Sequence, residues 1–221
     1  MTIVIDSMQN GIGLFDTPHE GYSVRRIDPK ETYHYLLNIH YAKRIPSISY
    51  AYGLYLDDDL VGVITYGSPA SPSLCTGICG PEYRSKVLEL NRLCLKNNQP
   101  NEASRLVGAS FKLLPKPTII VSYADTQQKH EGIVYQATNF LYTGLSSQRN
   151  EWTVKGLEHM HSKTLSDGNT LESIKEKYGD DFYYRERSRK HRYIMMLGSK
   201  SEKKQMIKDL RYEVQDYPSC S

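Results

Sequence analysis

The pattern of apolar and polar positions along the chain predicts a mixed α/β protein, because stretches of alternating period and of helical period follow one another. Strands are expected over residues 22–27, 50–56, 60–66, 87–95, 118–124, 142–154 (with a turn) and 192–197. Helices are expected over residues 28–41, 101–114, 130–140 and 171–178, with a Ser-, Pro- and Gly-rich loop over 67–80. We therefore expect one domain over residues 22–200, after an irregular arm (1–21) and before a basic helix and tail (201–221).

The first helix carries a start signal and an apolar stripe. Asp28 is expected as the N-cap, with a proline in the first turn and Glu31 closing a capping box. The residues of the stripe, at helical spacing, are Tyr33, Leu36, Leu37, His40 and Tyr41. His40 is therefore expected to face inward or into a cleft.

The strand over residues 87–95 contains a break in its alternation. Leu88 and Leu90 share one phase, whereas the two later leucines share the other, so the apolar phase slips by one residue at Asn91 and Arg92. Such a slip predicts a β-bulge, and bulges re-aim side chains near active sites. The alternative is an irregular edge strand.

Composition narrows the class of protein. The chain has 221 residues, 39% of them hydrophobic and 24% charged, and a mean hydropathy of -0.56. No apolar run approaches the roughly 18 residues that a membrane span requires, and the first residues resemble no secretion signal. We expect a cytoplasmic protein without a membrane partner. Cys75 and Cys79 lie close together, but no histidine pair completes a zinc pattern, so no metal site is expected.

Basic charge is concentrated near the C-terminus. Residues 185–211 hold ten Lys or Arg and three acidic residues, a net charge of +7, and the rest of the chain carries -4. This segment is either a solvated face or a surface that contacts phosphates. The candidate phosphate contacts are Arg185, Arg187, Arg189, Lys190 and Arg192. The 18 tyrosines fit half-buried strands, and they also fit a polar groove that stacks bases.

The order of the expected elements resembles the GCN5-related N-acetyltransferase (GNAT) fold. Residues 105–110 (RLVGAS) look like the pyrophosphate motif of that superfamily, in which exposed N–H groups at a helix N-terminus cradle phosphate. The resemblance assigns donor binding to Arg105, Gly108, Ala109 and Ser110, although Ser110 departs from the usual Gly or Ala. The fold class expected is a GNAT-like mixed sheet with flanking helices, whose strands over 87–95 and 118–124 splay apart.

Six runs of residues resemble the Mom family, the phage Mu-type proteins that modify DNA adenine. They are residues 39–41 (IHY), 89–93 (ELNRL), 121–125 (VSYAD), 130–140 (HEGIVYQATNF), 190–193 (KHRY) and 212–218 (YEVQDYP). Membership would imply conversion of adenine in duplex DNA to an N6-carbamoylmethyl derivative that protects phage DNA from restriction. It would also imply a protein encoded by a phage or prophage and acting in a bacterial host.

Several residues then acquire expected roles. Asp125 ends a buried strand, where α/β sheets present ligands, and is the candidate general base or amine-orienting group. The resemblance to acyltransferases implies that Tyr135 protonates the leaving group, and His40 and Tyr41 are placed where the acceptor enters. Arg92 is expected to contact a phosphate or Asp125. Ser122 and Tyr123, on the same strand as Asp125, are assigned to the donor site.

The expected partners are duplex DNA with a flipped adenine and an acyl donor. A flipped base is needed because an exocyclic amine inside the stack is out of reach. The donor is either acetyl-CoA, as the GNAT resemblance implies, or glycyl-tRNA, because a glycyl group supplies both carbons and the second nitrogen of the product. The sequence gives no indication of the oligomeric state.

Two other classes of protein remain open at this point. A conventional acetyl-CoA-dependent N-acetyltransferase, acting on a small molecule or a protein, would share the fold but would not need the basic segment. A DNA-binding module without catalysis would need the basic segment but not Asp125 or Tyr135.

Overall fold

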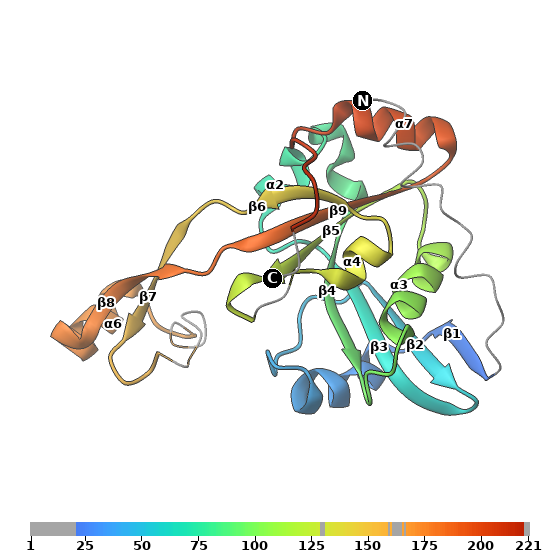
Figure 1. The fold of residues 1–221 in the computed structure, drawn as a ribbon. Helices are drawn as coiled ribbons and strands as arrows, with labels where there is room; N and C mark the ends of the chain where they lie inside the picture. The colour runs from blue at the N-terminus through green and yellow to red at the C-terminus, as the bar shows by residue number, and fades with distance from the viewer. Residues whose placement is uncertain (1–20, 129–130, 159, 161–164, 166, 219–221) are drawn as a thin grey trace.

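A seven-stranded mixed sheet forms the centre of the protein in the computed structural model, which describes residues 21–128, 131–158, 160, 165 and 167–218 (Figure 1). The strand order is β1-β2-β3-β4-β5-β9-β6. These strands are β1 (Tyr22–Arg26), β2 (Tyr50–Leu56), β3 (Asp59–Gly67), β4 (Val87–Leu95), β5 (Thr118–Asp125), β6 (Leu141–Leu145) and β9 (Lys190–Leu197). β4 and β5 are parallel, and the other neighbours in the sheet are antiparallel.

Helices cover both faces of this sheet. α3 (Glu102–Leu113) and α4 (Ile133–Ala137) cover one face, where Leu106 and Val107 pack against Tyr66 and Tyr193. The other face carries η1 (Pro29–Thr32) and η2 (Tyr35–Ile39) at one end and α2 (Pro72–Gly77), η3 (Pro81–Lys86) and α7 (Lys200–Asp209) at the other. The short η4 (Thr126–Gln128) follows β5. Among the described residues, no helix combines the length and the apolar character that a membrane span needs.

The predicted bulge in β4 is confirmed. Thr65 of β3 is opposite Arg92 and Tyr66 is opposite Leu90, so Asn91 has no partner in the ladder. The Asn91 side chain holds this conformation: its Oδ1 accepts a hydrogen bond from the Thr65 hydroxyl at 2.6 Å, and its Nδ2 donates to the Ser47 carbonyl at 2.8 Å. The slip in apolar phase therefore marks a real extra residue.

The predicted splaying of β4 and β5 is also confirmed. Their parallel register includes only three pairs, from Val87 with Ile119 to Glu89 with Val121. Beyond it, the Ser122 hydroxyl donates to the Leu90 carbonyl at 3.0 Å, and each strand continues without pairing to the other. The sheet thus opens between the second halves of β4 and β5.

The first helical segment differs from its prediction. The capping box at Asp28 forms as expected, but the segment divides into the 3-10 helix η1 and the π-helix η2. In η2 the His40 N–H donates to the Tyr35 carbonyl at 2.8 Å, a five-residue turn that rotates the buried face. Tyr35 and Leu36 are buried, whereas Leu37 is 42% exposed. The predicted apolar stripe is therefore wrong for most of its members.

A projecting arm is the main feature that the pattern did not predict. It consists of β7 (Arg149–Val154), α6 (Leu171–Tyr178), η5 (Gly179–Asp181) and β8 (Phe182–Arg187), with β7 and β8 paired in a separate two-stranded sheet. Figure 1 shows it extending away from the main sheet. Its own small core contains Ile174 and Val154, both 2% exposed. Trp152 and Phe182 stack there with ring centroids 5.7 Å apart.

The C-terminal segment packs on the domain instead of extending from it. Met206 of α7 is 1% exposed and packs against the sheet. Farther along, the Gln215 N–H donates to the Tyr142 carbonyl at 2.9 Å, and the Tyr217 hydroxyl donates to the Phe140 carbonyl at 2.7 Å. The irregular N-terminal segment expected over residues 1–21 lies almost wholly outside the described residues.

Candidate active site at the opening between β4 and β5

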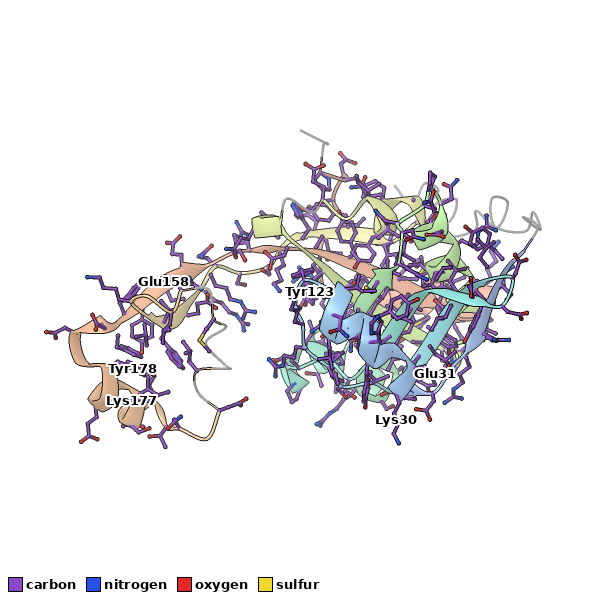
Figure 2. The ribbon with its side chains drawn as sticks, turned by 90° about the horizontal axis from the view of Figure 1, so that it is seen from below. Lys30, Glu31, Tyr123, Glu158, Lys177 and Tyr178 are labelled. Atoms are coloured by element: carbon purple, nitrogen blue, oxygen red, sulfur yellow. The ribbon has the colours of Figure 1, made fainter. Side chains whose placement is uncertain are left out.

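Two cavities meet at the opening between β4 and β5. We call the first, of about 430 Å³, the α4 cavity, because α4 forms one wall together with the end of η2 and the second half of β4. The second, of about 390 Å³, is called the arginine cavity and is lined by residues 70–74, residues 146–149 and the root of the arm. Glu89, Tyr123 and Lys190 line both cavities. Figure 2 places Tyr123 at the edge of the main body that faces the arm.

The structure brings together the residues to which the sequence assigned catalysis. His40, Tyr41, Asp125 and Tyr135 all line the α4 cavity, together with Arg92. His40 and Tyr41 directly follow η2, and the others come from β4, β5 and α4, elements that are far apart in the sequence. This gathering depends on the bulge and on the splayed strands, because continuous pairing of β4 with β5 would close the space between them.

Asp125 is firmly held at the end of β5. Its Oδ1 accepts hydrogen bonds from the Ser188 hydroxyl at 2.8 Å and from the Gln127 N–H at 3.0 Å, and its Oδ2 lies 3.4 Å from the Lys190 ammonium. Burial acts to raise the pKa of Asp125, but these contacts outweigh it, so the pKa lies below its ordinary value. This geometry suits a carboxylate that is held in place and orients an amine. It suits a strong base less well, because the pKa is lowered.

Tyr135 has a buried phenol at the wall of the α4 cavity. Its ring packs against Phe140 and Tyr193, with centroids 5.2 Å away in both cases. Burial raises the pKa of Tyr135 to about 12, although a hydrogen bond with Ser122 lowers it in part. The phenol is therefore neutral at physiological pH and can donate its proton.

His40 and Tyr41 stand at the rim of the same cavity. Their rings stack with centroids 4.5 Å apart, and Tyr41 is 59% exposed. The Nδ1 atom of His40 accepts a hydrogen bond from the Ala42 N–H at 3.1 Å. In the neutral imidazole the proton then resides on Nε2. The pair presents a flat, exposed surface beside the cavity.

Glu89 is a site residue that the sequence analysis did not single out. Its carboxyl lines both cavities, and burial raises its pKa even though Lys190, Arg92 and a hydrogen bond from the Ala70 N–H lower it. A carboxyl with a raised pKa in a cavity is a marker of functional sites. In the sequence, Glu89 is a single charged residue between Leu88 and Leu90 of an expected strand.

Arg92 has an unsatisfied donor. Its Nη1 donates to the Asn91 carbonyl at 2.6 Å, but its buried Nε has no hydrogen-bond acceptor among the described residues. Buried N–H groups are nearly always paired, so an acceptor from a bound molecule would complete this group. The Arg92 side chain lines the α4 cavity.

The pyrophosphate-like motif lies apart from both cavities. The Arg105 N–H already donates to the Asn101 carbonyl at 2.9 Å within α3, and its guanidinium lies 4.9 Å from the Tyr22 ring. Ser110 is fully buried, with its hydroxyl 2.6 Å from that of Tyr66. Neither Gly108 nor Ala109 lines either cavity. From this part of the chain, Asn98 and Ala103 line the α4 cavity instead.

The residues expected at the donor site on β5 differ in position. Tyr123 lines both cavities, and burial raises its pKa to about 12. Ser122 is fully buried and links β5 to β4 through the Leu90 carbonyl. His130, the first residue of the helix expected over residues 130–140, lies outside the described residues.

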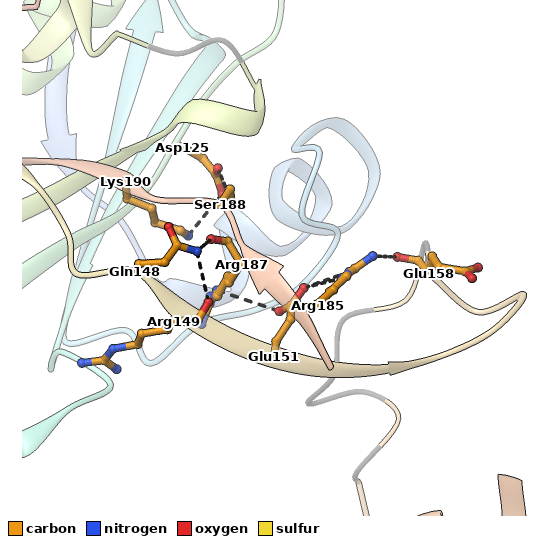
Figure 3. A network of polar contacts seen from close by, with 9 residues as sticks. All are labelled: Asp125, Gln148, Arg149, Glu151, Glu158, Arg185, Arg187, Ser188 and Lys190. Carbon is orange, nitrogen blue, oxygen red and sulfur yellow. Dashed lines mark hydrogen bonds and ion pairs between the residues drawn. The ribbon is translucent and has the colours of Figure 1, made fainter. Parts of the chain in front are cut away.

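The basic segment divides into residues that line the arginine cavity and residues that stabilise the fold. Arg187, Lys190 and Arg192 line the cavity. In contrast, Arg185 forms an ion pair with Glu151 at 2.8 Å (Figure 3), and the Arg189 Nε donates to the Ser146 carbonyl at 2.8 Å. A further arginine of the cavity, Arg149, was not singled out from the sequence because it lies outside the basic segment.

The splayed parallel pair with helices on both faces defines a GNAT-like mixed sheet. The chain belongs to the Mom protein family, whose family model matches residues 21–219. A relative from Escherichia phage Mu, described as the methylcarbamoylase mom, is 30% identical over an alignment of 193 residues. The match covers 81% of this chain and 76% of that protein.

Solved structures with a similar arrangement include two bacterial proteins. One is a GNAT-family acetyltransferase from Bacillus cereus, with 12% identity and a TM-score of 0.43 over 80% of this chain and 97% of that chain. The other is described as an acetyltransferase from Salmonella typhimurium with its cofactor acetyl-CoA. Its identity is 10% and its TM-score 0.46, over 81% of this chain and 95% of that chain.

Proposed function

We propose that this protein is a transferase that converts adenine in DNA to an N6-carbamoylmethyl derivative and so protects phage DNA from restriction in a bacterial host. The observation that carries the proposal is the gathering of His40, Tyr41, Asp125 and Tyr135 around one cavity in a chain of the Mom family. The phage Mu relative, described as a methylcarbamoylase, supports the same chemistry.

The two cavities suggest how donor and acceptor meet. The acyl donor occupies the α4 cavity, where the Nε of Arg92 lacks an acceptor among the described residues. The flipped adenine enters from the side of the arginine cavity, and not past His40 and Tyr41 as the resemblance to acyltransferases implied. In the transfer step the adenine nitrogen forms a bond with the acyl carbon, and the bond from that carbon to its leaving atom breaks. The nitrogen loses a proton, and the leaving atom gains one, so a glycyl donor gives N6-glycyl adenine. The free glycyl amine then attacks C6 through a five-membered spiro intermediate and the bond from C6 to the original nitrogen breaks. That nitrogen takes up the proton that the attacking amine loses and becomes the amide of the carbamoylmethyl group.

Residues of this chain can take the proton from the adenine nitrogen and supply the proton to the leaving atom in the acyl-transfer step. The Asp125 carboxylate, held by Ser188 and Lys190, orients the amine by accepting a hydrogen bond from it. The Glu89 carboxyl, with its raised pKa, is the stronger base and takes the proton. The neutral phenol of Tyr135 gives a proton to the leaving atom.

This proposal is tested by expressing the chain in a bacterial host and measuring modified adenine by mass spectrometry of the nucleosides. Asp125→Asn keeps the shape but removes the charge that orients the amine, so we expect at least about a 100-fold loss, the scale of acid–base and orienting groups. A wild-type chain that yields no modified adenine, yet acetylates a small amine, would favour the conventional acetyltransferase. Binding to DNA without any modification would favour the non-catalytic module.

The donor is separated by isotopic labelling in the same cells. A glycyl group supplies both carbons and the second nitrogen, whereas an acetyl group has no source for that nitrogen. Cells fed with glycine labelled with carbon-13 and nitrogen-15 should therefore give a fully labelled carbamoylmethyl group if the donor is glycyl-tRNA. An unlabelled carbamoylmethyl group excludes the glycyl route.

A further inference from the structure

Two arginines face each other at the root of the arm. In the β7–β8 ladder, Arg149 is directly opposite Arg187. Like charges in opposite positions of an antiparallel pair destabilise it. Glu151 compensates these positive charges only weakly. Its carboxylate lies 2.8 Å from the Arg185 guanidinium but 4.0 Å from that of Arg187. The root of the arm therefore carries two arginines at paired positions of the ladder. Glu151 is a distant ion-pair partner for Arg187, and Arg149 forms no ion pair with a described residue.

Both of these arginines line the arginine cavity, and the rest of its lining also suits an anion. Hydroxyl groups come from Ser71, Ser73, Ser146 and Ser147, whereas the Ser188 hydroxyl is already donated to Asp125. Arg192 lies over the Tyr212 ring at 3.5 Å, and Lys190 is already paired with Asp125. Among the described lining residues, Glu89 is the only carboxylate. Guanidinium pairs combined with hydroxyl donors match the geometry of a phosphate group.

The distribution of charge along the arm indicates where a nucleic acid lies. The far end of the arm carries four carboxylates (Glu172, Glu176, Asp180 and Asp181) against Lys175 and Lys177, a net charge of -2 that repels a phosphate backbone. The root carries the arginine pair next to Tyr123, which lines both cavities. A duplex is therefore attracted to the root and repelled from the tip.

We propose that Arg149 and Arg187 clamp the phosphodiester of the DNA strand next to the flipped adenine. This inference rests on the proposed function, since it places the DNA backbone beside the cavity that admits the base. A phosphate in the arginine cavity would accept hydrogen bonds from both guanidinium groups and neutralise charge at the root of the arm, so the binding of DNA also stabilises the arm.

Arg149→Gln is the most direct test. We expect about tenfold weaker binding to a short duplex, because a hydrogen bond to a charged group is lost. The slope of log K against log salt should fall by about 0.9, the value for one phosphate contact. Thermal stability without DNA should be unchanged or higher, because the variant removes one of two opposed charges.

Lys175→Gln is the matched control, because Lys175 is also a cation of the arm but lies on α6, over the Phe182 ring at 5.4 Å. It removes the same net charge, and we expect the salt slope to stay at the wild-type value. Equal losses in both variants would overturn the clamp, since only net charge would then matter. Wild-type DNA binding and salt slope in the Arg149→Gln variant would overturn it as well.

Two further measurements distinguish a failure of the phosphate clamp from a failure of the proposed function. If Arg149→Gln weakens the binding of acetyl-CoA but not of duplex DNA, the site holds a donor phosphate and the clamp is wrong. Modified adenine is measured independently in cells that express the wild-type chain. Its presence together with an unchanged Arg149→Gln variant refutes only the clamp, whereas its absence refutes the proposed function.

Discussion

Tyr135→Phe is expected to lower the yield of modified adenine by about 100-fold or more, the usual contribution of a general acid. The substitution removes only the hydroxyl, so the ring contacts with Phe140 and Tyr193 at 5.2 Å are retained and the protein should fold normally. Because burial raises the pKa of Tyr135 to about 12, the phenol stays protonated over the physiological range. The loss should therefore be the same at every pH between about 6 and 9, within the range where a group of that pKa stays neutral.

Tyr142→Phe is the control for this variant. Its ring also packs against Tyr193, with centroids 5.2 Å apart, but its hydroxyl lies 2.8 Å from the His191 Nδ1 and lines neither cavity. We expect the control to keep most of its activity. Nucleoside mass spectrometry on DNA from cells with equal protein levels compares the two. Wild-type modification by the Tyr135→Phe protein would remove the phenol from the mechanism.

The opening between β4 and β5 could be predicted from the sequence because its cause is local. A bulge shifts the phase of alternation within a single strand, and the leucines on either side of Asn91 and Arg92 record that shift. Asp125 could be placed beside the opening because it ends a buried apolar run. Tyr135 followed from the resemblance to acyltransferases, and the structure places it on the same cavity.

Other features depend on packing that no local pattern records. The stripe over η2 failed because a π-helical turn changes the angle between successive side chains, and the sequence near Tyr35 carries no signal of that turn. The arm was missed because β6 and β7 were expected as one stretch over residues 142–154, and no strand was expected at β8. Whether β7 and β8 join the main sheet or pair only with each other is decided by tertiary contacts.

The two site residues that the sequence analysis missed show the same limit. Arg149 is significant because of its partner across the ladder, and cross-strand register is a property of the folded pair. Glu89 is significant because burial raises its pKa, and burial follows from the packing of the loop around Ala70 against β4. In the sequence, Arg149 and Glu89 are single charged residues, each typical of a solvated strand face.

Glu89→Gln is expected to lower the yield of modified adenine by about 100-fold or more, because it removes the proposed base. It should also make the protein more stable at neutral pH. Burial raises the pKa of Glu89, so the folded state holds this proton more tightly than the unfolded state does. The stabilising contribution of the protonated group is present below the ordinary pKa and is lost as the pH rises through the raised value. Glutamine is neutral at every pH and avoids that loss.

Loss of activity with a gain in stability would distinguish a base from a packing residue. The amide oxygen of the substituted glutamine can still accept a hydrogen bond from the Ala70 N–H, so the loop should keep its position. The charged groups facing Glu89 are Lys190 of β9 and Arg92 of β4, and neither loses its proton in the acid range. Wild-type activity should therefore rise with pH through the pKa of Glu89, and the residual activity of the variant should lack this rise. A variant that is less stable at pH 7, or that keeps the acid limb of the wild-type profile, would contradict this role for Glu89.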